Sequence, residues 1–155
     1  MTRSNALETL TDLAREARDK AGQLLASDRK NEHQILAHQE MLMNYRQEYA
    51  DQLQQLMMSG IDPVTLYNYR QFLMSLDDSI QKASQALRQQ NHKVQASKKN
   101  WQQEQQKLTS YTTLQDRRHA QVRQQAARQE QRQTDEFTTN RAARTVGLHV
   151  VGSED

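Results

Sequence analysis

A seven-residue hydrophobic repeat, interrupted only once, limits what this chain can fold into more than any other feature. The interruption is the segment Ser59-Gly60-Ile61-Asp62-Pro63, which holds the only proline of the sequence. Glycine suits the left-handed residue after a helix, aspartate caps the start of the next helix, and proline is tolerated at its first position. We therefore expect helices at about 4–58 and 63–140, a turn at 59–63 and a flexible tail over 145–155, with Ser4 or Asn5 capping the first helix.

The repeat runs through both expected helices with spacings that alternate between three and four residues. This alternation is typical of a left-handed coiled coil. In the first helix the repeat comprises Leu7, Leu10, Ala14, Ala17, Ala21, Leu24, Asp28, Asn31, Ile35, His38, Leu42, Tyr45, Tyr49, Gln52 and Leu56. In the second helix it comprises Leu66, Tyr69, Leu73, Leu76, Ile80, Ala83, Leu87, Gln90, Val94, Ser97, Trp101, Glu104, Leu108 and Tyr111. The polar members weaken the apolar seam and can fix its register.

The two seams predict an antiparallel hairpin within one chain. Folding at the turn brings Tyr49 near Leu73, Leu42 near Ile80 and Ile35 near Leu87. At the far end, small residues of the first helix (Ala14, Ala17, Ala21) oppose large residues of the second (Trp101, Leu108, Tyr111), which fills the space between the helices. A parallel homodimer would set each tryptophan against its copy and pack poorly. The predicted class is all-α, a long two-helix antiparallel coiled coil whose C-terminal helix overhangs beyond about residue 115.

Composition agrees with this architecture and excludes most enzymes. Only 35% of the residues are hydrophobic and 24 of 155 are glutamine, whereas a compact domain is nearly half apolar. Without cysteine there are no disulfides and no thiolate chemistry. The sequence has no glycine-rich phosphate loop, and its five histidines do not share a helical face. We expect no enzymatic activity, no cofactor, no metal site and no small-molecule substrate.

The charge distribution favours a protein partner over a nucleic acid. Residues 115–145 contain seven arginines, but four acidic residues interrupt them, and the net charge of the chain is only +2. A basic DNA-binding helix would be denser in arginine and lysine. No apolar run has the length that a membrane span needs. We therefore expect a cytoplasmic protein.

Apolar residues near the turn exceed what one seam can bury. Leu42, Tyr45 and Tyr49 lie on the first helix, with Phe72 and Leu76 just across the turn. A second stripe on the first helix comprises Leu36, Met43, Leu53 and Met57. Because a two-stranded coil buries one narrow stripe per helix, the surplus must be exposed or covered by a partner. Whether Tyr45 and Tyr49 are contact residues or core residues stays open at this point.

Several segments, in this order, resemble the flagellar FliJ family. They are Ala6-Leu7-Glu8-Thr9-Leu10, Asp12-Leu13-Ala14, Tyr45-x-x-Glu48-Tyr49, Asn68-Tyr69-x-Gln71-Phe72, Trp101 and Thr113-Leu114-Gln115-Asp116-Arg117. The resemblance implies a non-enzymatic, stalk-like coiled-coil subunit of the flagellar type III export apparatus. Such a subunit binds the hexameric export ATPase, promotes its ring assembly, contacts the export gate protein FlhA and binds export chaperones. It would reach the inner membrane only through these partners.

The resemblance also implies two sets of partner-binding residues. The export-gate set is Leu42, Tyr45, Tyr49, Phe72 and Leu76, with His38, Ser79 and Ala83 as further members. The ATPase-ring set, at the open end of the hairpin, is Leu7, Leu10, Leu13, Arg15, Arg18, Leu114, Arg117, Arg118 and Arg123. Three alternatives stay open: the equivalent stalk of a virulence injectisome, a generic coiled-coil adaptor, and a nucleic-acid binder.

Overall fold

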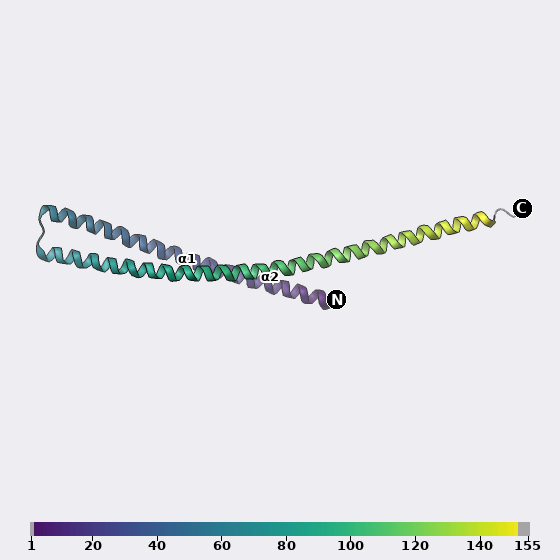
Figure 1. Cartoon of the computed structure of the whole chain (residues 1–155), viewed down its shortest axis with the longest axis horizontal. Helices are drawn as coiled ribbons and strands as arrows, with labels where there is room; N and C mark the ends of the chain where they lie inside the picture. The colour runs from purple at the N-terminus through teal and green to yellow at the C-terminus, as the bar shows by residue number, and fades with distance from the viewer. Residues whose placement is uncertain (1, 152–155) are drawn as a thin grey trace. The chain divides into compact units, whose positions relative to one another are not determined.

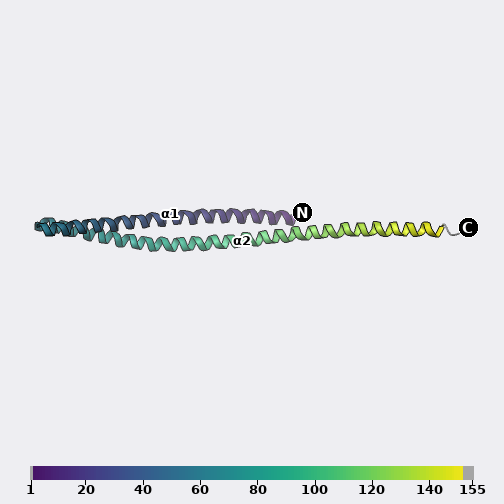
Figure 2. The same ribbon diagram turned by 90° about the horizontal axis from the view of Figure 1, so that it is seen from above.

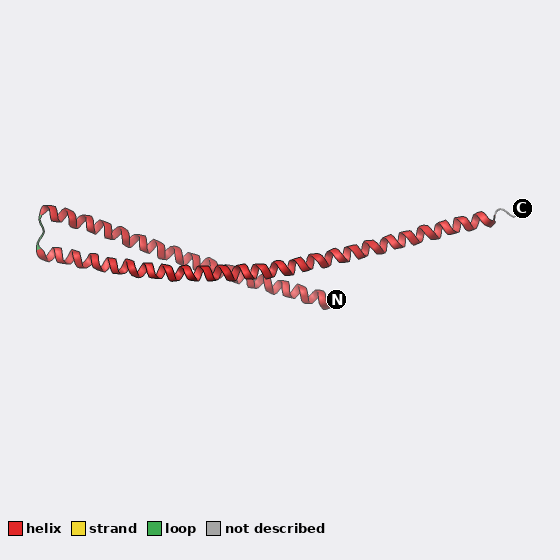
Figure 3. Cartoon of the chain, viewed as in Figure 1, coloured by secondary structure: helices red, strands yellow, loops and turns green. Residues whose placement is uncertain are grey.

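The computed structural model describes residues 2–151, which form two helices. Helix α1 (Thr2–Ser59) and helix α2 (Pro63–Val151) are joined by a short turn (Figure 1). Within residues 2–151 there is no strand (Figure 3). The predicted all-α class with two long helices packed against each other is confirmed. The helices contribute to two compact units, which we call the hairpin unit (Asp12–Leu108) and the terminal unit (Met1–Thr11 with Thr109–Asp155).

Both helices extend further than the sequence analysis expected. Helix α1 begins at Thr2 rather than after a cap at Ser4 or Asn5, and α2 continues to Val151 rather than ending near residue 140. Nothing between residues 64 and 146 breaks a helix, because that stretch contains neither glycine nor proline. Its glutamine, arginine and alanine residues all favour helix. Residues 141–151 are thus helical, and residues 152–155 of the expected tail lie outside the described residues.

The turn forms as its residue types predict. Gly60 has a φ of +97°, in the left-handed region that side chains with a Cβ rarely adopt. The carbonyl of Asp62 accepts the first helical hydrogen bond of α2 from the N–H of Leu66, at 3.1 Å. The hydroxyl of Thr65, which bonds the Asp62 carboxylate, lowers the pKa of Asp62 below its ordinary value of 3.8, and the Thr65 N–H acts in the same direction. Asp62 is therefore the N-cap of α2.

The cap makes a specific prediction about pH. Because the pKa of Asp62 is lower in the folded state, its ionised form stabilises the fold above the unfolded pKa of about 4, and this contribution is lost as the pH falls through the folded value. Asp62→Ala should lower the melting temperature most at neutral pH, and the gap to the wild type should close in strong acid. Asp62→Asn is the matched control, since asparagine caps without ionising. A gap for Asp62→Ala that is equally large in acid would contradict the assignment.

The seam of α2 in the hairpin unit is the one predicted. Every predicted position from Leu66 to Leu108 is buried or half-buried. Across from it, the indole of Trp101 lies against Gly22, where an added Cβ would come within 3.4 Å of the ring. A small residue thus opposes the large indole, as expected, and Gly22 joins the buried Ala21 beside it as a small residue of this part of the seam.

The seam of α1 is the predicted one only at every second position. Ala14, Ala21, Ile35, Leu42, Tyr49 and Leu56 face α2, and Asp28 is half-buried among them. Ala17 is also half-buried, but from Leu24 onward the intervening positions are shifted by one residue, because Leu25 and Leu53 are buried while Leu24 and Tyr45 are exposed. One residue turns the helix by about 100°, so Tyr45 lies beside the seam rather than in it.

Contacts across the hairpin unit fix its register. Gln39 Nε2 donates to Ser84 Oγ at 2.7 Å, and Arg46 forms an ion pair with Asp77. These pairs agree with the predicted antiparallel register to about two residues, and Figure 2 shows the two helices from a second direction. Further along, Gln90 Nε2 donates to the carbonyl of Asp28 at 2.9 Å and Ser97 Oγ donates to the Asp28 carboxylate. Part of the seam is thus polar but hydrogen-bonded.

Candidate partner-binding surfaces

One side of the hairpin unit carries an exposed aromatic cluster. The ring of Tyr49 lies 4.5 Å from that of Phe72 and 6.3 Å from that of Tyr69, measured between centroids and tilted in both pairs. Tyr45 is 46% exposed and Phe72 is 42% exposed. Tilted aromatic pairs at this spacing attract each other. The cluster therefore joins α1 to α2 and still presents apolar area to the solvent.

The predicted export-gate residues divide into an exposed layer and a buried layer. His38, Tyr45 and Phe72 are exposed, and Leu42, Tyr49 and Ser79 are half-buried. Leu76 and Ala83 are buried in the seam, at 8% and 7% exposure. The structure therefore brings all eight residues together in the hairpin unit, but Leu76 and Ala83 lie beneath the surface. We call the six accessible residues the aromatic face.

A shallow groove adjoins the aromatic face. It has a volume of about 430 Å³, and its lining includes Ile35, His38, Ala83 and Ala86. The small side chains of Ala83 and Ala86 leave room between the helices. His38 belongs to both the face and the groove, so the two form one continuous surface. Sequence analysis did not identify Ala86, because it lies one residue before the predicted seam position Leu87.

Polar bridges occupy the other side of the hairpin unit. The pairs Arg46–Asp77 and Gln39–Ser84 link the two helices there. The bonded Asp77 carboxylate raises the pKa of Arg46. On α1, three members of the predicted second stripe (Leu36, Met43, Met57) are exposed. The fourth, Leu53, is a core residue and corrects that prediction, because it fills the seam position one residue after Gln52.

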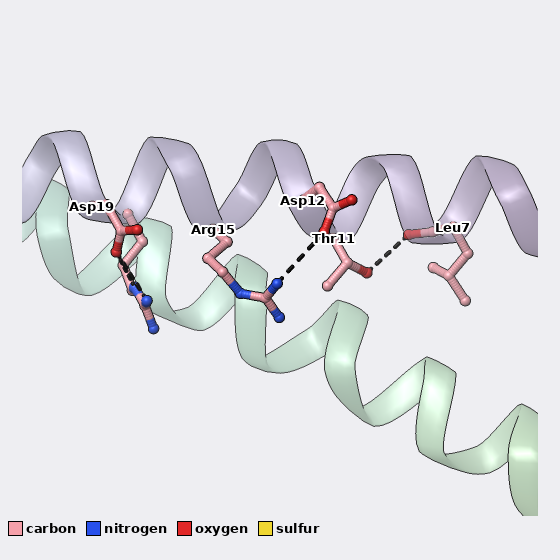
Figure 4. Close-up of polar contacts among 6 residues, drawn as sticks. Leu7, Thr11, Asp12, Arg15 and Asp19 are labelled. Carbon is pink, nitrogen blue, oxygen red and sulfur yellow. Dashed lines mark hydrogen bonds and ion pairs between the residues drawn. The ribbon is translucent and has the colours of Figure 1, made fainter.

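The terminal unit contains six of the predicted ATPase-ring residues. Leu10, Leu114, Arg117, Arg118 and Arg123 are exposed, and Leu7 is half-buried. Arg118 reaches α1, since its Nη1 donates to the carbonyl of Arg3 at 2.9 Å. Thr11, which sequence analysis did not single out, is 2% exposed and donates its hydroxyl to the carbonyl of Leu7 at 2.8 Å (Figure 4).

The other three predicted ATPase-ring residues belong to the hairpin unit. Leu13 and Arg15 are exposed and Arg18 is half-buried. Each arginine has an acidic neighbour on its own helix. Arg15 pairs with Asp12 at 3.5 Å (Figure 4). Arg18 pairs with Asp19 at 2.9 Å. Exposed pairs of this kind contribute little stability, so both arginines can exchange their partners at small cost.

Among residues 2–151, no group of three histidine or acidic side chains could hold a metal ion. Nor does any helix in that range have the length and apolarity to cross a membrane. The aromatic face and the exposed arginine and leucine residues listed above are the candidate partner-binding surfaces.

The fold and these surfaces define a long two-helix coiled-coil protein with an aromatic face on its hairpin. A family profile described as "Flagellar FliJ protein" matches residues 3–147. The Flagellar FliJ proteins of Salmonella typhi and Escherichia coli (strain K12) are 35% and 33% identical to the chain over 144 residues, which are 93% of this chain and 98% of each relative. The chain belongs to the FliJ family, whose members are structural subunits of the flagellar type III export apparatus.

A solved structure shares the fold. It is that of a protein described as a YscO homologue from Chlamydia trachomatis, which superposes with a TM-score of 0.69. The alignment covers 96% of this chain and 94% of the other, at 13% sequence identity. The paired-helix architecture therefore persists where most side chains differ.

The two layers of the gate set predict different costs of truncation. Leu76→Ala removes a buried seam residue and should lower the free energy of unfolding by roughly 2–5 kcal/mol. Tyr45→Ala removes a half-exposed ring and should cost less than about 1 kcal/mol. Urea unfolding followed by circular dichroism measures both. Equal costs would mean that Tyr45 is a core residue after all.

Proposed function

We propose that this chain is the stalk-like, non-enzymatic subunit of its flagellar export apparatus, binding the hexameric export ATPase and the cytoplasmic part of the export gate FlhA. The observation that carries the proposal is the aromatic face, since Tyr45 and Phe72 are exposed at positions that the family resemblance assigns to the gate. Exposed aromatic residues on a largely polar surface commonly mark contact sites. Both curated relatives are flagellar proteins, which favours the flagellum over an injectisome.

We assign the ATPase contact to two other segments of the chain, residues 7–18 and 114–123. The arginine and leucine residues of 7–18 and 114–123 are exposed, half-buried or weakly paired, so they are available to a partner. A coiled-coil hairpin supplies stiffness, which a stalk inside a ring requires. The proposal also includes promotion of ring assembly and binding of export chaperones. Through these partners the chain would lie at the cytoplasmic side of the inner membrane.

The gate contact is tested by substituting the exposed rings together. Tyr45→Ala with Phe72→Ala should weaken binding to the purified cytoplasmic region of FlhA by about tenfold or more, because buried aromatic anchors dominate such interfaces. Helix content and melting temperature should change little. Leu36→Ala with Met43→Ala is the matched control, since these residues are similarly exposed but belong to the second stripe. Unchanged FlhA binding by the ring variant would remove the gate from the proposal.

The ATPase contact is tested by titrating the chain into the cognate export ATPase. Hydrolysis and ring formation, followed by phosphate release and light scattering, should both increase. A chain truncated after residue 115 keeps the whole hairpin unit and should stay folded, but it should stimulate the ATPase poorly because it lacks Arg117, Arg118 and Arg123. Full stimulation by the truncated chain would show that the overhang is not needed. No stimulation by the complete chain would refute the ATPase contact.

A further inference from the structure

The methionines of the chain are concentrated in one part of the hairpin unit, on its surface. Five of the six lie between residues 41 and 74. All five are exposed, and among residues 2–151 no methionine is buried. They are Met41, Met43, Met57, Met58 and Met74. The buried apolar residues of the seam are instead leucine, valine and alanine. This part of the hairpin therefore carries its thioethers in contact with water and outside the seam.

An exposed thioether is open to oxidation by a hydroperoxide. The methionine sulfur attacks one oxygen of hydrogen peroxide, and an S–O bond forms as the O–O bond breaks. The transferred oxygen gives its proton to the departing hydroxide, which leaves as water. The sulfur is thereby oxidised to the sulfoxide, the peroxide is reduced, and sulfoxide reductases reverse the change. Because the chain contains no cysteine, none of its own thiols competes for the oxidant.

Met41 and Met43 form a natural pair for comparison. They flank Leu42, which faces α2, and they are 43% and 48% exposed. Since one residue turns the helix by about 100°, the two methionines lie on opposite sides of the seam. A sulfoxide at either position stays in water and disturbs no buried contact. Oxidation should therefore leave the fold intact at both positions.

Only one methionine of this pair borders the aromatic face. Met41 follows His38 by three residues and precedes Tyr45 by four, so the three side chains share one face of α1. Met43 follows Leu36 by seven residues and belongs with it to the second stripe. Met41 therefore extends the apolar area around Tyr45, whereas Met43 lies away from it.

We propose that Met41 is an oxidation site that controls the aromatic face. A hydroperoxide converts its thioether to the sulfoxide, and the oxidised face binds the export gate more weakly. The sulfoxide oxygen is a hydrogen-bond acceptor, and an apolar partner surface that covers it supplies no donor. The inference rests on the proposed function and adds a reversible, oxidant-sensitive step to the gate contact.

The oxidation itself is tested without the gate. The full chain is treated with hydrogen peroxide, and the sulfoxide at each methionine is followed over time by peptide mass spectrometry. Met58, at 84% exposure, should be oxidised first, and Met41 and Met43 should follow at similar rates. Helix content and melting temperature should change little. If Met41 stays reduced until urea unfolds the chain, or if helix content falls as Met41 is oxidised, the proposal is wrong.

Control of the gate contact is tested by calorimetric titration with the cytoplasmic region of FlhA, after the peroxide has been removed. Oxidation should weaken binding by the wild type about tenfold, and sulfoxide reductase should restore it. Met41→Leu keeps a similar volume without a thioether, so its affinity should survive oxidation. Met43→Leu is the matched control and should lose affinity on oxidation as the wild type does.

The outcomes separate this inference from the proposed function. If the reduced and oxidised wild type bind equally well, or if oxidation weakens Met41→Leu as much as the wild type, the control by Met41 is wrong while the gate contact stands. If the reduced wild type does not bind FlhA, the gate contact fails, and the control by Met41 fails with it.

Discussion

A pair of helices can bury only one narrow stripe of side chains on each, and the rest of this molecule follows from that limit. The stripe is filled in the hairpin unit by residues such as Ala14, Leu25, Leu53, Leu76 and Leu108, all below a tenth exposed. Every further apolar residue has to lie at the surface. Tyr45, Phe72 and Val122 are surplus in this sense. In a chain with so few hydrophobic residues, surplus apolar area indicates a contact surface rather than a packing error.

The sequence was sufficient for the helices, the turn and one of the two seams. Gly60, Asp62 and Pro63 act locally, so their roles can be deduced from residue type alone. In α2 the predicted repeat from Leu66 to Leu108 is the seam that the structure adopts. In α1 the repeat was ambiguous, because Leu24 adjoins Leu25 and Gln52 adjoins Leu53. Both choices keep the alternation of three and four, and the pairing of Arg46 with Asp77 on α2 marks the one adopted.

Polar seam residues account for the register better than the apolar ones do. Leucines can slide past one another with little change in contact, but a buried carboxylate must meet its donors. Asp28 meets Ser97 through its carboxylate and Gln90 through its carbonyl. One turn further, Glu32 Oε2 is a buried oxygen that has no hydrogen-bond partner among the described residues. This part of the seam therefore lowers stability while excluding other alignments of the two helices, as a polar seam position does in other coiled coils.

Residue types in the sequence alone could predict one of the two candidate sites, the aromatic face, but not the other, the groove of the terminal unit. The aromatic face could be anticipated from the sequence. Tyrosine and phenylalanine are rare in the chain as a whole, so their concentration near the turn is conspicuous. The groove of about 650 Å³ between residues 3–8 and 115–125 could not be anticipated, because Val122 is a single valine in a polar helix and Arg118 is one arginine among several. The hydrogen bond from Arg118 to the Arg3 carbonyl, which relates this part of α2 to α1, is visible only in the structure. The two surfaces also differ in chemistry. The six residues of the aromatic face carry no formal charge when His38 is neutral, whereas the groove combines Leu7 and Val122 with Arg3, Arg118 and Glu8. Since each is built from residues of a single unit, substitutions can affect one without the other, and two partners of different chemistry can be separated by mutation.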